Sequence, residues 1–110
     1  MDEMAVSRLA ALAQITRVNV FKALMKAGPE GLPAGVLSTQ LNVAPNTLSA
    51  HLSVLSQAGL VSARRDGRMR IYAVELEAVS QLLGYLVDDC CQGHLEVCAP
   101  IAARSAAQNC

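Results

Sequence analysis

The chain has 110 residues and no net charge, and 53% of its residues are hydrophobic. This length fits one domain. A small domain buries only part of its surface, so a chain this rich in apolar residues is expected to cover the remaining apolar side chains in an oligomer interface. A membrane-spanning helix is excluded, since the longest apolar stretch, residues 76–87, is too short and is interrupted by polar residues. The N-terminus is acidic and shows no secretory signal, so we expect a cytoplasmic protein.

Three helices are predicted before residue 42. Apolar residues recur at three- and four-residue steps over residues 4–27, and Thr16 suits a cap that divides this stretch into two helices. The segment 28–31, Gly-Pro-Glu-Gly, ends the second helix, because glycine suits a C-cap and proline cannot continue a helix. A third helix is predicted over residues 33–41. Its expected inward side chains are Val36, Leu37 and Leu41.

A fourth helix is predicted over residues 45–58, since Pro45 suits a first helical position and Gly59 suits the C-cap. Three leucines spaced i, i+4 and i+7 mark its buried face. The other face is polar but uncharged, whereas a solvated helix face usually carries lysine and glutamate. Small hydrogen-bonding side chains suit a surface that enters a DNA major groove. The candidate DNA contacts on this face are Asn46, Thr47, Ser49, His51 and Ser53.

A β-hairpin is predicted over residues 60–74, because Asp66-Gly67 between two β-prone runs allows positive φ at both turn positions. Residues 1–74 carry eight bases and four acids, a net charge of +4, against −4 for residues 75–110. Half of those eight bases cluster at the hairpin tip, as expected for phosphate or minor-groove contacts, although a solvated hairpin would also need charge. They are Arg64, Arg65, Arg68 and Arg70.

A last helix is predicted over residues 77–92, with a broad apolar stripe and Gly93 at its end. This apolar stripe is wider than the core of one small helical domain can bury, so the helix is expected to pair with a second copy of the chain. We expect one domain over residues 1–99. Residues 100–110 show weak patterning and are expected to form a flexible tail.

Three thiols lie within nine residues near the end of the chain, at Cys90, Cys91 and Cys98. Where the cytosol keeps thiols reduced, such a cluster indicates a soft-ion site or a redox sensor rather than a structural disulfide. In a straight helix Cys91 and Cys98 would be separated by a rise of about 10 Å, so one ion requires a break at Gly93. Cys90 alone fits an ordinary buried thiol, and no role is expected for Cys110.

The element order, four helices, a hairpin and a helix, is that of a winged helix-turn-helix domain. The run LNVAPNTLSAHLSVLSQAGLVSARRDGRMRIYAV resembles the ArsR/SmtB family of bacterial metalloregulators, and the resemblance covers residues 6–98. It implies a mainly α, dimeric fold with a β-hairpin wing (α-α-α-α-β-β-α). It also implies a repressor that binds double-stranded operator DNA, with no enzyme activity and no organic cofactor.

The cysteine arrangement resembles that of the arsenite-responsive branch of this family, which implies As(III) or Sb(III) as inducer at Cys90, Cys91 and Cys98. The Cys-Val-Cys that many arsenic repressors carry in the recognition helix is missing, since residues 47–51 contain no thiol. The repeated Asp and His spacing of the zinc-sensing members is missing too. The neighbouring acids, Asp88 and Asp89, favour a neutral metalloid adduct over an anionic zinc thiolate.

Two alternatives to metalloid sensing follow from the same thiols. A redox- or persulfide-sensing repressor of the same fold would form a disulfide between Cys98 and either Cys90 or Cys91. An enzyme such as a thiol-dependent arsenate reductase would need a phosphate-binding loop or a nucleophile beside a base, and the sequence shows neither. We therefore expect a DNA-binding protein and not an enzyme.

Overall fold

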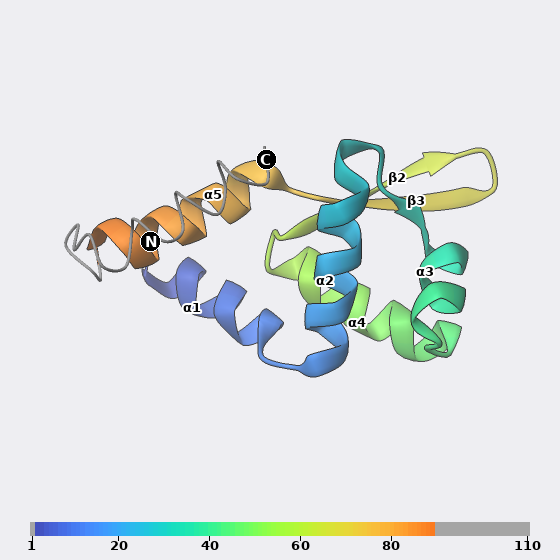
Figure 1. Ribbon diagram of the computed structural model, residues 1–110, viewed down its shortest axis with the longest axis horizontal. Helices are drawn as coiled ribbons and strands as arrows, with labels where there is room; N and C mark the ends of the chain where they lie inside the picture. The colour runs from blue at the N-terminus through green and yellow to red at the C-terminus, as the bar shows by residue number, and fades with distance from the viewer. Residues whose placement is uncertain (1, 90–110) are drawn as a thin grey trace. The chain divides into compact units, whose positions relative to one another are not determined.

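The computed structural model describes residues 2–89 (Figure 1). The chain divides into two units, residues 1–79 and 80–110. The predicted order of helices and hairpin is confirmed, with three short additions. The elements are α1 (Asp2–Leu12), α2 (Ile15–Ala27), the 3₁₀ turn η1 (Gly28–Glu30), β1 (Leu32–Pro33), α3 (Ala34–Leu41), α4 (Pro45–Gln57), β2 (Val61–Asp66), β3 (Met69–Val74), α5 (Leu76–Gly84) and the π-helical turn η2 (Tyr85–Asp89). No helix within residues 2–89 is long and apolar enough to cross a membrane.

The core of the first unit lies between α2, α3, α4 and the base of the hairpin. Its most deeply buried side chains are Val20, Leu24, Leu37, Leu48, Leu52, Leu55 and Leu60. Burying one such side chain contributes about 1.5–3 kcal/mol, so these residues set how α4 is rotated about its axis. The predicted inward position of Val36 is wrong, because α3 buries Leu37 completely and leaves Val36, one step around the helix, 45% exposed.

The boundary between α1 and α2 differs from the prediction. Gln14, not Thr16, is the N-cap of α2, and its side-chain Oε1 accepts a hydrogen bond from the Arg17 backbone N–H at 2.9 Å. Thr16 lies within the first turn of α2, where its hydroxyl cannot cap the helix. Glutamine is an infrequent cap, which is why the sequence pattern favoured the threonine.

A tight turn joins α3 to α4. Asn42 ends α3 in the left-handed conformation at φ 54°, and the Ser38 hydroxyl donates to the Val43 carbonyl at 2.5 Å. Asparagine tolerates this conformation better than most residues do. Helix α4 then begins at Pro45, as predicted, and the turn sets the angle at which α4 leaves α3.

The end of α4 is held by a buried arginine from α1. Arg8 is only 9% exposed, and its Nε donates to the Ala58 carbonyl at 3.2 Å while its Nη1 donates to the Ala78 carbonyl at 3.4 Å. Gly59 follows α4 with φ 78°, which confirms the predicted glycine stop. Arg8 therefore ties the C-terminal end of α4 to Ala78 in the first turn of α5.

The sheet has three antiparallel strands in the order β1-β3-β2. Asp66 pairs with Met69, so the two turn residues are Gly67 and Arg68 rather than the predicted Asp66 and Gly67. Only Gly67 has positive φ, at 65°, as a type II′ turn requires at its first central position. The hairpin extends beyond α3 as an arm (Figure 1).

Strand β1 is a two-residue strand that no sequence pattern predicted. It is reached through Gly31, which has φ 73° and passes so close to β3 that an added Cβ would lie 2.2 Å from the Tyr72 carbonyl oxygen. Gly28 has nearly the same φ, 75°, but a Cβ there would meet nothing within 4 Å. The two glycines thus share a backbone conformation and differ in their surroundings.

Replacing Gly31 with alanine is expected to lower the free energy of unfolding by more than about 3 kcal/mol, because backbone strain and a clash with β3 add together. Gly28→Ala is the matched control and should lower the free energy of unfolding by about 1–3 kcal/mol from the strain alone. Urea unfolding followed by circular dichroism, at one protein concentration, measures both. Equal losses in the two variants would contradict the close approach of Gly31 to Tyr72.

The last helix also differs from the prediction of one continuous helix over residues 77–92. It is α-helical from Leu76 to Gly84 and then takes the wider π geometry from Tyr85 to Asp89. Such turns occur often at functional sites. The predicted stop at Gly93 and the expected tail over residues 100–110 lie outside the described residues.

Candidate nucleic-acid interface

The outward face of α4 is polar, small and uncharged. Because Leu48, Leu52 and Leu55 are buried, the residues about 100° or more around the helix from them face solvent. Four of the five predicted contacts on this helix are exposed: Asn46, Thr47, Ser49 and Ser53. The face also exposes Ala50, Val54 and Gln57, which are not among the predicted contacts, although the leucine spacing places them opposite the core.

The fifth predicted contact, His51, lies at the edge of this face and is half-buried. Its Nδ1 lies 3.4 Å from Nη1 of Arg17, whose Nε donates to the Ala11 carbonyl at 2.5 Å. A guanidinium can only donate, so Nδ1 is the acceptor and the proton of the neutral ring is assigned to Nε2. Arg17 thereby leaves His51 with one N–H donor at the edge of α4.

One face of the hairpin changes from buried to charged along its length. At the base Val61 and Val74 are buried and packed in the core. Next come Ala63 and the half-buried Tyr72, which also packs against the core. Nearer the tip, Arg65 and Arg70 face each other across the strands, and both are exposed.

The same face of the hairpin meets α4 along a groove of about 400 Å³. Its lining comes from both elements: Ser49, Ser53 and Ser56 of α4 with Ala63, Arg70 and Tyr72 of the hairpin. No acidic side chain lines it, and its hydroxyls and guanidinium can all donate hydrogen bonds. The outward face of α4 and the hairpin therefore form one continuous donor-rich surface, which we call the α4–wing surface.

The four predicted arginines of the hairpin are all exposed, but they differ in their surroundings. Arg64 donates from Nη2 to the Glu30 carbonyl at 2.9 Å, whereas Arg68 occupies the turn. Arg65 and Arg70 stand directly opposite each other, and like charges in that position destabilise a strand pair. A polyanion at the hairpin tip would relieve that repulsion.

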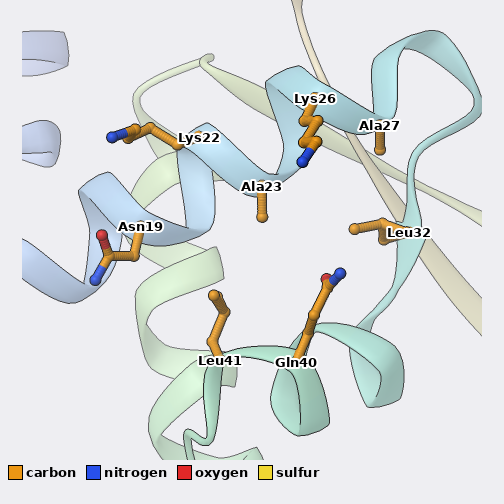
Figure 2. A pocket seen from close by; sticks show the side chains of 8 residues that line it. All are labelled: Asn19, Lys22, Ala23, Lys26, Ala27, Leu32, Gln40 and Leu41. Carbon is orange, nitrogen blue, oxygen red and sulfur yellow. The ribbon is translucent and has the colours of Figure 1, made fainter.

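A second hollow, of about 520 Å³, lies between α2 and α3 and shares no residue with the α4–wing surface (Figure 2). Ala23, Leu32 and Leu41 form its apolar part. In Figure 2 the Lys26 side chain turns into the space between the helices, while the Lys22 amine extends away from it. These exposed lysines provide positive charge outside the α4–wing surface.

The predicted metalloid ligands Cys90, Cys91 and Cys98 lie outside the described residues. Within the residues that the structure does describe, no group of three or more His, Cys, Asp or Glu side chains could hold a metal ion. The described part of the chain thus supplies the donor-rich α4–wing surface, and the thiol site remains a prediction from the sequence.

Comparison with known proteins identifies the same architecture. Residues 12–63 match the family model described as a helix-turn-helix domain. The nodulation protein NolR of Rhizobium meliloti is 35% identical over 86 residues, which are 78% of this chain and 68% of NolR. The putative arsenical resistance operon repressor ArsR of Halobacterium salinarum is 37% identical over 81 residues, which are 74% of this chain and 62% of that protein.

Solved structures agree with these relatives. An ArsR-like transcriptional regulator from Rhodococcus sp. RHA1 is 25% identical, with a TM-score of 0.72 over 94% of this chain and 92% of its own. The homodimeric winged helix-turn-helix DNA-binding domain Mb0332 from Mycobacterium bovis, solved by NMR, is 29% identical, with a TM-score of 0.65 over 86% of this chain and 83% of its own. The winged helix-turn-helix architecture of the described residues is therefore confirmed.

Proposed function

This chain belongs to the ArsR family of winged helix-turn-helix transcriptional regulators, and we propose that it is a homodimeric repressor released from its operator by trivalent arsenic or antimony. Members of this family are DNA-binding regulators rather than enzymes. The proposal has three parts: binding of duplex DNA by the α4–wing surface, pairing of two chains, and condensation of the metalloid with Cys90, Cys91 and Cys98.

The observation that carries the DNA-binding part is the continuity of α4 with the hairpin. An uncharged helix face of small side chains fits the major groove, where base edges are read by hydrogen bonds and apolar contacts. The opposed guanidiniums of Arg65 and Arg70, next to that face, fit the phosphate backbone. This division places base reading on α4 and phosphate binding on the hairpin.

Exposed apolar side chains on the terminal helices support the homodimer. On α1, Met4, Val6 and Leu9 are 51%, 63% and 41% exposed, and on α5 Leu76 and Leu83 are 51% and 48% exposed. Pairing across a twofold axis would cover such side chains. Two α4 helices would then enter successive major grooves about 34 Å apart on a palindromic site.

The donor set of three thiols fits a trivalent metalloid. Arsenous acid condenses with three thiols to a neutral As(SR)₃ adduct and three molecules of water, so no charge is added beside Asp88 and Asp89. Soft sulfur ligands favour such thiophilic centres over hard cations. Cys90 and Cys91 follow directly after the π-helical turn η2, so a change at these thiols would act on the end of the α5 segment.

A single titration tests this proposal. A duplex is first selected from a random-sequence library, and its affinity is then measured at fixed salt with arsenite, antimonite, zinc, cadmium or peroxide. Arsenite or antimonite should weaken binding about five- to 150-fold, the usual range of allosteric coupling. Release by peroxide alone, reversed by reductant, would instead support the thiol redox sensor. Release by zinc alone would contradict both.

His51 offers a finer test of the recognition helix. The amide nitrogen of glutamine can replace the Nε2–H of histidine, whereas that of asparagine replaces Nδ1. If Nε2–H donates to a DNA phosphate, His51→Gln should keep the affinity within about twofold and His51→Asn should lose about tenfold. Fluorescence anisotropy on the selected duplex measures both. The reverse order, in which His51→Asn keeps the affinity and His51→Gln loses it, would show that His51 acts through its Nδ1 contact with Arg17.

A further inference from the structure

Two apolar side chains lie in the middle of the polar outward face of α4. Val54 is 37% exposed, whereas the leucines of this helix are 1% exposed or less, and Ala50 is exposed one turn earlier. Residues four apart on a helix are neighbours on its surface, so the methyl groups of the two side chains form one small apolar patch. Thr47 and Ser53 flank this patch and are exposed.

The rotation of α4 directs this patch outward. Measured from the mean direction of the buried leucines, Ala50 lies about 170° around the helix and Val54 about 130°. Both therefore belong to the part of α4 that would lie deepest in a major groove. Ala50 is also short enough to let the helix backbone come close to the bases.

The major-groove edges of the bases offer one apolar group for such a patch. Adenine, guanine and cytosine present hydrogen-bond donors and acceptors there, whereas thymine adds its 5-methyl group. A patch of methyl groups gains free energy by covering that methyl and gains nothing from a polar edge. The chemistry of the patch thus distinguishes thymine from the other three bases.

We propose that Ala50 and Val54 read the 5-methyl group of a thymine in each half-site of the operator. This inference rests on the proposed DNA binding and names the base that the middle of α4 selects. Asn46, Thr47 and Ser53 then contact the polar edges of the neighbouring bases. The inference makes Val54 a residue that determines sequence specificity.

Deoxyuridine provides the test, because it differs from thymidine only in lacking the 5-methyl group. Each thymine of the selected duplex is replaced in turn, symmetrically in both half-sites, and binding is measured by anisotropy at fixed salt. At one thymine position the affinity for DNA should fall about fourfold for each methyl group removed, and therefore about fifteenfold for the two half-sites together. Val54→Ala should weaken binding to the unmodified duplex by a similar factor.

The combination of the two changes identifies the contact. If Val54 touches the methyl group, the Val54→Ala variant should bind the deoxyuridine duplex about fifteenfold more weakly than the unmodified protein binds the unmodified duplex. Two independent effects would multiply to a loss of affinity of roughly 200-fold. Val36→Ala is the matched control, since Val36 is 45% exposed on α3, and it should leave the thymine preference unchanged.

The outcomes separate this inference from the proposed function. A selected duplex that binds tightly but tolerates deoxyuridine at every position, or contains no thymine facing α4, overturns the inference and leaves the DNA-binding function intact. If the losses of binding free energy from Val54→Ala and from deoxyuridine add in the combined experiment, the assignment of the methyl contact to Val54 is overturned. Failure to select any duplex overturns the proposed function and the inference with it.

Discussion

Replacing Cys98 with serine should leave the affinity for the selected duplex within about twofold and remove the response to arsenite. The DNA contacts that we propose lie on α4 and the hairpin, and Cys98 is not among them. A trivalent arsenic needs its third sulfur, because two thiolates leave one coordination position to water or hydroxide. Measured by anisotropy with saturating arsenite, release should fall from about five- to 150-fold to no more than about twofold.

Cys110→Ser is the matched control, since it makes the same chemical change at a thiol outside the proposed site. It should respond to arsenite as the unmodified protein does. A Cys98→Ser variant that still releases DNA with arsenite would remove Cys98 from the site. One that binds DNA poorly without any metalloid would show that the thiol serves the fold instead of the signal.

Arg65→Gln should weaken DNA binding and stabilise the free protein at the same time. Each phosphate contact contributes about 0.9 to the slope of log affinity against log salt, so losing one contact in each wing of a dimer should reduce the slope by about 1.8. Removing the repulsion between Arg65 and Arg70 should raise the free energy of unfolding by about 0.2–1 kcal/mol. Binding isotherms over a range of salt and urea unfolding measure the two effects.

Lys22→Gln is the control for that experiment, because it removes the same charge from an exposed side chain of α2, outside the α4–wing surface (Figure 2). It should leave the salt slope unchanged. A slope that falls equally in both variants would mean that DNA senses only the total charge. An unchanged slope in Arg65→Gln would remove the hairpin tip from the interface.

Those parts of the fold that depend on local chemistry could be predicted from the sequence. Pro45 and Gly59 mark the two ends of α4. Proline suits a first helical position and glycine suits the positive φ that follows a helix, and both effects are local. The leucines of α4 identify its buried face for a similar reason, since helical spacing alone aligns them. The hairpin was found from the Asp66-Gly67 signal even though its turn is shifted by one residue.

Features that depend on contacts distant in sequence could not be predicted. Strand β1 forms where the chain at Gly31 passes close to Tyr72, and a strand of two residues is too short to show the alternating pattern that identifies strands in a sequence. The contact between His51 and Arg17 joins residues 34 positions apart in the chain, and no local pattern reveals it.

The candidate site shows the same division. The exposed arginines and the polar face of α4 follow from composition and spacing. The groove that joins them follows from the strand register, which places Ala63, Arg70 and Tyr72 opposite the serines of α4. Ala50 and Val54 were overlooked because apolar residues on a helix are usually assigned to the core, although the leucine spacing already directed them outward.

Backbone amide NMR of the protein titrated with the selected duplex is the most direct test of DNA recognition by the α4–wing surface. The largest shift changes should fall on residues 45–57 and on residues 61–74, with little change at Lys22 or Lys26 between α2 and α3. Changes centred on that hollow, with α4 and the hairpin unaffected, would contradict the assignment of the DNA-binding surface.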